Sequence, residues 1–316
     1  QSLGGVAQKN GNVAELQSSG LQFTLSTVNL KVKNFSWTTG FSYLHKTNKI
    51  TSLLSNPTVR TMISGSGFSY EGYPLSSVFS IPFLGLTNEG MPRFYNERGQ
   101  ETLGDFNFSS SNINFLKYSG TLDPTDVGTL TNTFRYKNFD LNVFVNGTYG
   151  NKVYNYMKMK LTHMNSLWSN QLKDVTKRAR LEPIDPSKTY APGSYWYTDA
   201  SNIRVANPET NIPRATITDP NDNDVISDRY IEDGSYIRLK NIALGYTLPK
   251  KWISKWGIDN LRVYVNIQNL LTITGYDGYD PEIGASTADI NGYTYGLDNG
   301  RYPSPTTYSF GLNLTF

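Results

Sequence analysis

Strict alternation of apolar and polar residues is the feature that most limits how this chain can fold. The clearest case is the closing stretch TYSFGLNLTF, in which every second side chain is apolar. Successive side chains of a β-strand point to opposite faces, so the pattern predicts a strand with one apolar and one polar face. The apolar face of this strand carries Tyr308, Phe310, Leu312, Leu314 and Phe316.

The same two-residue period recurs along the chain. It is clear in residues 13–28, 34–44, 130–136, 138–150 and 260–271. It is weaker in residues 74–86, 105–118 and 235–248. In residues 260–271 the predicted apolar face holds Leu261, Val263, Val265 and Ile267, and the polar face holds Arg262, Asn266 and Gln268.

The composition fits an all-β chain of half-apolar strands. Hydrophobic residues are only 38% of the 316 residues, yet aromatic residues reach 13% and include 22 Tyr. This combination is typical of strands that alternate apolar and polar side chains between girdles of aromatic residues. A net charge of +3 without a basic run gives no support for nucleic-acid binding.

Several other classes of structure are excluded. Cysteine is absent, so neither a disulfide nor a thiolate metal site can form. No apolar run approaches the ~20 residues of a membrane-spanning helix. The opening stretch QSLGGVAQKNGN lacks the charged and apolar parts of a signal peptide, so we expect any export signal to have been removed already.

Connections of unequal length predict an outer-membrane β-barrel. Residues 28–33 and 137–138 form short turns, whereas residues 150–233 and 275–302 form long loops. Barrels of this class have short turns on the periplasmic side and long loops outside the cell. Counting the crossings places the C-terminus in the periplasm and gives about seven or nine strands.

An odd number of strands cannot close a single-chain barrel of this class, and an open sheet edge is not tolerated in lipid. We therefore expect the chain to be part of a larger barrel, whose other strands pair with its first and last strands. Between the strands at residues 235–248 and 260–271, Trp252 and Trp256 lie among lysines. This segment predicts either a short helix at the inner membrane interface or an ordinary surface helix.

The sequence resembles the SusC/RagA-like TonB-dependent transporters of the Bacteroidota. The resemblance is most specific in residues 228–284 and in the closing YPSPTTYSFGLNLTF, and it extends to residues 134–155 and 13–50. It implies that residues 1–316 are the C-terminal part of a barrel of twenty-two antiparallel strands with long extracellular loops. The family's N-terminal plug and TonB-contacting segment have no counterpart in this chain.

The resemblance also implies partners and a function. Family members import glycans or peptides across the outer membrane, driven through TonB, and pair with a SusD-like surface lipoprotein, commonly as a dimer of such pairs. The expected partners are therefore this lipoprotein, the remaining barrel and plug, TonB through the missing segment, membrane lipid and the imported ligand. The terminal aromatic strand, Tyr308 to Phe316, resembles the signal that the barrel-insertion machinery recognises.

Three stretches in the long loops are candidate sites. GSYWYTD places Tyr195, Trp196 and Tyr197 together; such aromatic side chains stack on sugar rings, or pack against a partner or within the loop. In DPNDNDV, the residues Asp219, Asn221 and Asn223 occupy alternate positions, a spacing that suits Ca²⁺ ligands. The stretch lacks the glycine of an EF-hand loop, and its composition is also typical of a solvated turn. Apart from this possible Ca²⁺ ion, no cofactor is expected.

The third stretch is YDGYDPE, with Asp277, Asp280 and Glu282. Paired carboxyl groups are the groups that glycosidases use, but the Gly and Pro favour a tight loop. The two histidines, His45 and His163, form no catalytic motif, so we expect no enzyme activity. The alternative to a nutrient importer is a structural or sugar-binding adhesive β-protein, for example a β-sandwich.

Overall fold

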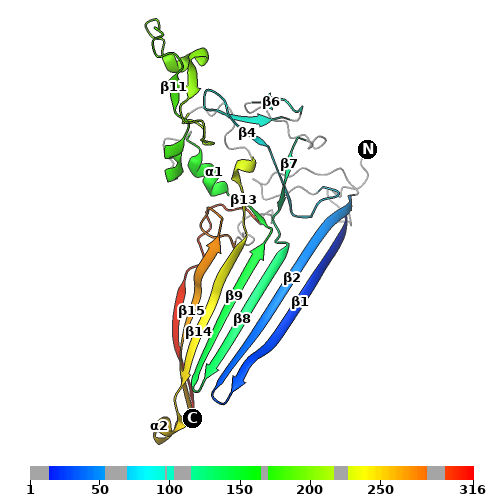
Figure 1. Cartoon of the computed structure of the whole chain (residues 1–316), viewed down its shortest axis with the longest axis vertical. Helices are drawn as coiled ribbons and strands as arrows, with labels where there is room; N and C mark the ends of the chain where they lie inside the picture. Colours follow the sequence, from blue (N-terminus) through cyan, green and yellow to red (C-terminus); the bar gives the residue numbers. More distant parts are fainter. Residues whose placement is uncertain are drawn as a thin grey trace, which may run out of the picture.

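The computed structural model describes residues 14–53, 70–96, 98–102, 115–164, 170–216, 227–282 and 296–316. Its main feature is one antiparallel sheet of seven strands, here called the wall (Figure 1). In order across the sheet, these are β1 (Ala14–Val32), β2 (Phe35–Leu53), β8 (Asp126–Tyr136), β9 (Phe139–Tyr149), β14 (Tyr236–Thr247), β15 (Asn260–Thr274) and β16 (Thr307–Thr315). Seven is the lower of the two predicted counts.

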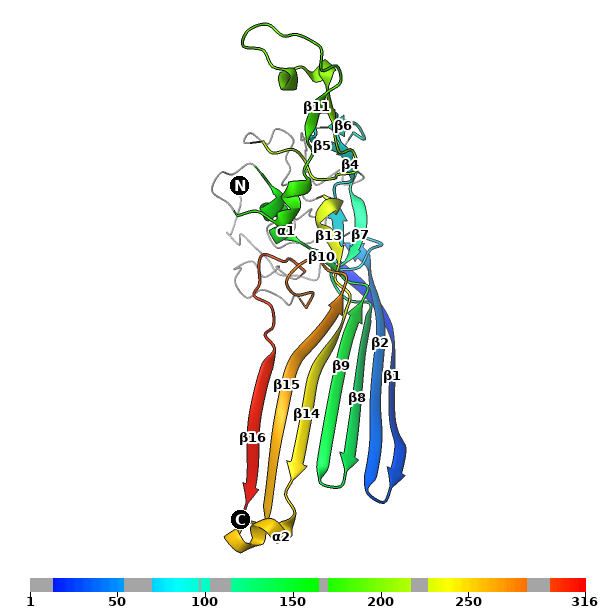
Figure 2. The ribbon, with the colours of Figure 1, turned by 60° about the vertical axis from the view of Figure 1, so that its left-hand side comes forward.

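The wall is curved and open (Figure 2). β1 and β16 lie at opposite ends of the strand order and do not pair with each other in the described residues. A small closed barrel would have required that pairing. The expectation that both end strands pair with strands outside this chain stays a prediction.

At one end of the wall, here called the turn end, two-residue turns join β1 to β2 and β8 to β9. β8 and β9 are joined by Lys137–Asn138, and Lys137 has φ 51°, the left-handed conformation that tight hairpins use. The predicted first turn at residues 28–33 is wrong, because β1 continues to Val32 and turns at Lys33–Asn34. A register shift between Val28 and Leu30 breaks the alternation there, so the pattern ended before the strand did.

The strand register confirms the predicted division into two faces. Val265 pairs with Phe310 on one side and with Leu244 on the other, so their side chains share what is here called the apolar face. Arg262 projects from the opposite, polar face and reaches Asp140 there. Side chains of the apolar face stay open, with Phe310 79% and Leu244 48% exposed. The β-sandwich alternative needs a second sheet on this face, and the described residues contain none.

The weak pattern of residues 235–248 has a local cause. The register of β14 shifts between Leu239 and Asn241 against both of its neighbours. On β15, Asn269 takes φ 53° near the same level. Apolar-face residues therefore change from odd positions such as Ile237 to even positions such as Leu244.

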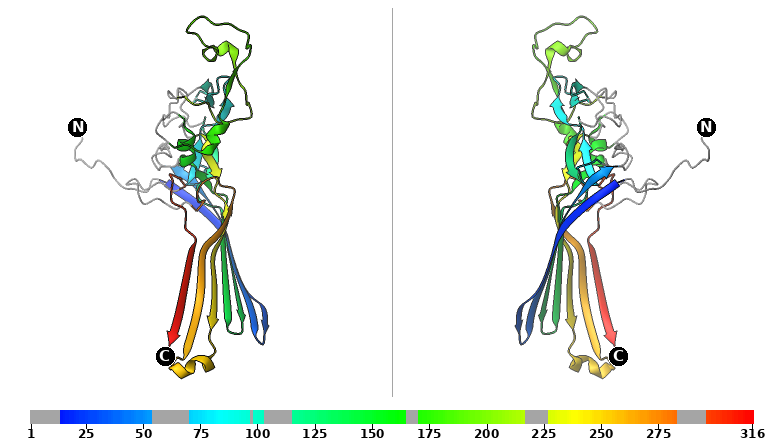
Figure 3. Two further views of the ribbon diagram at one scale, coloured as in Figure 1. Left: turned by 90° about the vertical axis from the view of Figure 1, so that its left-hand side faces the viewer. Right: turned by 90° about the vertical axis from the view of Figure 1, so that its right-hand side faces the viewer.

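The connections at the other end of the wall fold into many short elements, here called the outer region (Figure 3). Its strands are β3 (Ser77–Ser80), β4 (Phe83–Leu86), β5 (Pro92–Tyr95), β6 (Glu101–Thr102), β7 (Lys117–Thr121), β10 (Lys152–Tyr154), β11 (Leu181–Pro183), β12 (Ile203–Val205) and β13 (Ile231–Asp233). Its helical turns are α1 (Tyr156–Thr162), η2 (Lys173–Lys177), η3 (Trp196–Thr198), η4 (Ala200–Asn202) and η5 (Asp228–Tyr230). The predicted strand at residues 74–86 is divided between β3 and β4, and most of residues 105–118 lie outside the described part.

Small hydrophobic clusters hold the outer region together. The larger one contains the buried residues Val78, Leu122, Tyr154, Met159 and Tyr230. The other is built around Ile81 and Phe94, with Phe83 packed against it. These clusters bring β3, β10, α1 and η5 together from distant parts of the sequence, above the wall.

A short helical segment lies at the turn end, between β14 and β15. It consists of α2 (Lys250–Ile253) and η6 (Ser254–Trp256), as predicted, and it lies near the C-terminus (Figure 1). Ile253 is buried, while Trp252 and Trp256 are 56% and 70% exposed. Among the described residues, no helix is long and apolar enough to cross a membrane.

Candidate ligand and partner surfaces

The acidic stretch YDGYDPE is a clamp between a loop and the wall. Arg238 on β14 is 2% exposed and donates hydrogen bonds to the carboxylates of both Asp280 and Glu282. Lys240 adds a contact of 2.8 Å to Glu282. Asp280 also accepts a hydrogen bond from the backbone N–H of Ser304, so it ties both ends of the last loop together.

In this clamp, the two carboxylates of Asp280 and Glu282 are paired with the two cations Arg238 and Lys240. Burial alone would raise the pKa of Asp280, but hydrogen bonds from Ser304 and Arg238 outweigh it and hold that pKa below its ordinary value. Both carboxylates are therefore bound by cations rather than directed at an open cleft. The arrangement explains these residues as loop anchors and offers no pair of free carboxyl groups for glycoside hydrolysis.

A second polar junction lies beside the clamp. Lys158 of α1 places its Nζ 2.9 Å from both Glu232 of β13 and Asp277 of the last loop. Burial tends to lower the pKa of Lys158, but these two carboxylates outweigh it and raise that pKa. Tyr276 donates a hydrogen bond of 2.5 Å to Asp298, and burial with this bond raises the pKa of the Tyr276 hydroxyl. The connection between β9 and β14 and the connection between β15 and β16 are thereby fixed to each other.

The aromatic candidates lie on an arm that projects from the outer region (Figure 2). β11 and β12 pair at the base of this arm, and η3 and η4 lie near its tip. The rings of Tyr195 and Tyr197 stack with centroids 5.1 Å apart and planes 8° apart, and they are 53% and 47% exposed. Trp196 meets Tyr197 edge to face at 5.8 Å. The three aromatic side chains therefore lie together on the arm, and their role as a ligand contact stays a prediction.

A polar core makes the tip of the arm rigid. Asp199 accepts hydrogen bonds from Lys188 Nζ at 2.6 Å and from the Tyr190 hydroxyl at 3.1 Å. Lys188 and Ser201 hold the pKa of Asp199 below its ordinary value. Asn202 in turn donates to the Tyr190 hydroxyl at 2.7 Å. The exposed tyrosine pair is therefore presented by an ordered support.

Metal-binding candidates are not found in the described part of the chain, where no three His, Asp or Glu side chains converge on one point. The calcium candidate, Asp219, Asn221 and Asn223, lies outside the described residues. His45 Nδ1 lies 2.8 Å from Asp126 at the outer end of the wall, where Tyr43 also donates to Asp126.

Glycines on the wall make room for large side chains of the neighbouring strands. Arg262 of β15 reaches across Gly245 of β14 to bind Asp140 of β9 at 2.5 Å. A Cβ on Gly245 would lie 2.2 Å from the Arg262 guanidinium, and a Cβ on Gly311 would lie 2.4 Å from the Tyr264 ring. These contacts belong to the polar face.

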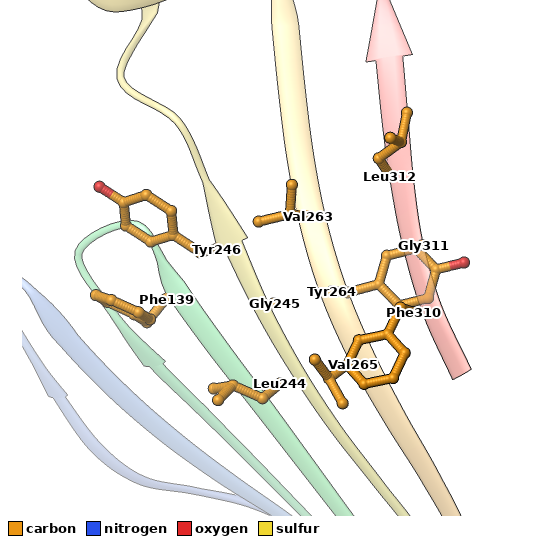
Figure 4. A pocket seen from close by; sticks show the side chains of 10 residues that line it. All are labelled: Phe139, Leu244, Gly245, Tyr246, Val263, Tyr264, Val265, Phe310, Gly311 and Leu312. Carbon is orange, nitrogen blue, oxygen red and sulfur yellow. The ribbon is translucent and has the colours of Figure 1, made fainter. Parts of the chain in front are cut away.

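Near the same glycines the apolar face forms a shallow hollow (Figure 4). Phe310 and Leu312 of β16 line it, together with Val263 of β15 and Leu244 of β14. Of the predicted terminal row, Tyr308, Phe310, Leu312 and Leu314 alternate along β16, and Phe316 follows the strand, 81% exposed. The geometry places this row on the apolar face, and its role in assembly is untested.

The sequence did not identify Arg238, Lys158 or Arg262 as key residues. Each is a cation in or next to an apolar stretch, and such a residue needs a counter-charge when buried. The signal available in the sequence was the presence of two cations, Arg238 and Lys240, at the start of a weakly alternating strand. Their carboxylate partners are remote in sequence, so periodicity could not reveal the pairs.

Several known proteins are similar to this chain in sequence or in fold. No protein-family model matches the chain. The TonB-dependent receptor P3 of Formosa agariphila is 29% identical over 99% of the chain, and the TonB-dependent receptor SusC of Bacteroides thetaiotaomicron is 22% identical over 98%. The structure of the RagAB peptide transporter superposes with a TM-score of 0.71 at 20% identity, covering 96% of this chain. The chain spans about 30% of the length of the curated relatives it matches.

Proposed function

Because the chain resembles the SusC/RagA-like TonB-dependent receptors from end to end and has the fold of their barrel wall, we propose that it is part of an outer-membrane nutrient importer. The observation that carries this proposal is the contrast between the two ends of the wall. Its apolar face is open along the strands, and structured loops gather at one end only. An exposed apolar face and loops gathered at one end are the features expected of a sheet that lies in lipid and carries its recognition loops on one side of the membrane.

The proposal includes the orientation of the chain. The apolar face contacts lipid and the polar face lines the barrel interior, with the outer region outside the cell. The C-terminus and the α2 segment are then periplasmic. Trp252 and Trp256 are exposed at that end among lysines, which suits the membrane interface.

The proposal also includes the partners. Pairing with a SusD-like surface lipoprotein is supported by the similarity to SusC and to a RagAB structure. The remaining barrel strands, the plug and the contact with TonB belong to parts of the transporter outside this chain, and the complexes form dimers of pairs. The cargo is a glycan or a peptide, and the apolar row of β16 guides barrel assembly.

Uptake by intact cells tests the importer function. Cells carrying the full transporter should accumulate cargo only when TonB is present and the membrane is energised. Accumulation that continues without TonB would refute the proposal.

The aromatic pair on the arm is the proposed ligand contact. Changing both Tyr195 and Tyr197 to Ala should weaken ligand binding by roughly 0.5–1.5 kcal/mol, the range for an aromatic contact beyond its area. Ile184→Ala, at the base of the same arm and 52% exposed, is the matched control and should leave binding unchanged. Equal binding by all three proteins would assign the pair to packing or to a partner instead.

A further inference from the structure

Arg229 is a cation enclosed by aromatic rings in the outer region. It lies in η5, between the two hydrophobic clusters described above. Its guanidinium carbon is 4.8 Å from the centre of the Phe83 ring and 5.0 Å from the centre of the Tyr230 ring. The two rings come from β4 and η5, so the position of the guanidinium is set by two separate elements.

In the part of the chain that the structure describes, this guanidinium has no counter-charge. Its Nη1 atom is buried without a hydrogen-bond partner. The neighbouring carboxylate, Asp228, is already engaged by Lys117 Nζ at 3.0 Å and by the backbone N–H of Phe83. Among the described residues, no carboxylate forms an ion pair with Arg229.

Two other cations near this end of the wall have counter-charges. Arg238 and Lys158 each contact two carboxylates. Burial lowers the pKa of Arg229, and no acid of the described ranges offsets this effect. A guanidinium stays charged in proteins, so an unpaired one in an apolar setting is costly unless an anion reaches it.

The rest of the side chain keeps partial access to solvent. A guanidinium offers a planar fork of donors that matches a carboxylate at two points. The nearby rings of Phe83 and Tyr230 restrict the motion of that fork, which reduces the entropy lost on binding. The site is therefore prepared for a planar anion arriving from outside the chain.

We propose that Arg229 recognises a carboxylate on an acidic oligosaccharide, which is the cargo of the transporter. This inference rests on the proposed importer function and narrows its substrate class. A sugar rather than a peptide is favoured by the exposed, stacked Tyr195 and Tyr197 at the same end of the wall, because flat rings of this kind pack against sugar rings.

The test is a binding measurement on the purified full transporter complex with two probes, a uronic-acid tetrasaccharide and its fully methyl-esterified, neutral form. The wild type should bind the acid roughly 10- to 100-fold more tightly than the ester, as expected for hydrogen bonds to a charged group. Arg229→Met should lose this preference. Arg204→Met is the control, since Arg204 is an exposed arginine of the arm that already pairs with Glu182.

Folding is checked by melting temperature. If Arg229→Met melts early, Arg229→Lys replaces it, since it retains the charge but not the two-point fork, and its preference for the acid should fall below that of the wild type. The inference is overturned if the wild type binds acid and ester equally, if Arg229→Met keeps the preference, or if only an acidic peptide binds selectively. Because binding is measured without energised uptake, a transporter that imports but does not discriminate overturns this inference and leaves the importer function intact.

Discussion

The wall and the outer region of this protein are held together by different means. The wall consists of strands of 9 to 19 residues whose backbones pair along their length, with a few register shifts, while large side chains such as Phe310 stay exposed. The outer region consists of strands of 2 to 5 residues and short helical turns. There, a buried polar group such as Asn155 is satisfied by a specific side-chain contact, in this case with Glu232.

With the proposed function, this difference reflects the two environments that one chain meets. In lipid, the backbone must satisfy its own hydrogen bonds and the outward side chains need only be apolar. In water, short segments cannot hold a conformation without tertiary contacts, so ion pairs and small clusters define the loops. The wall should therefore tolerate many apolar exchanges, whereas the outer region should depend on a few named residues.

The largest effect is expected at the junction between the two regions. Arg238→Met removes the cation and leaves Asp280 and Glu282 without it, which should destabilise the loop by about 3–5 kcal/mol, as for other broken buried ion pairs. Limited proteolysis of the folded transporter should then cut within residues 275–282. Lys251→Met, on the exposed α2 segment, is the control and should not change the cleavage pattern. An uncut loop in Arg238→Met would mean that the outer region does not depend on this clamp.

A pair of adjacent substitutions tests the wall. Leu244 lies on the apolar face and Ala243 on the polar face, one residue apart on β14. Leu244→Arg should destabilise the barrel by about 1–2 kcal/mol, which is less than the cost of a cation at the bilayer midplane because Leu244 lies close to the turn end of β14. Ala243→Arg, facing the interior, should cost much less. Heat-induced loss of the folded band on gel electrophoresis measures both, and equal effects would contradict the assigned faces.

A change of pH should act on the outer region and spare the wall. The pKa of Asp280 in the folded protein lies below its ordinary value of about 3.9, so its contribution to stability is complete above that pH and is lost as the pH falls through the lower, folded value. Hydrogen exchange of residues 275–282, corrected for the intrinsic rate, should therefore quicken below about pH 4. Asp280→Asn should show fast exchange already at neutral pH. Protection of β9 should stay unchanged across this range.

The sequence predicts the wall better than the outer region, for a physical reason. A two-residue period is local, so the strands around Val145 and Val265 and their faces could be read directly from it. The period fails at bulges, and this is why the first turn was placed before Val32. The resemblance to a known family then supplied the barrel, which periodicity alone leaves open.

The candidate sites were harder to predict because they depend on contacts between remote residues. The aromatic group at Tyr195 was visible as a cluster in the sequence, but its stacking was not. The acids of YDGYDPE were visible, but their cations lie more than forty residues away. Nothing in the local sequence marks Arg229 as unpaired, since that property belongs to the folded surroundings of its side chain.

The bond from Arg262 to Asp140 has a consequence for how this wall can evolve. It joins residues 122 positions apart and passes over Gly245, where any side chain would collide with the guanidinium. The three positions are therefore coupled. Substitution of Gly245 should be neutral only where Arg262 has already been replaced. Among descendants of this chain, positions 140, 245 and 262 should change together, and the order of change should begin with the charges and end with the glycine.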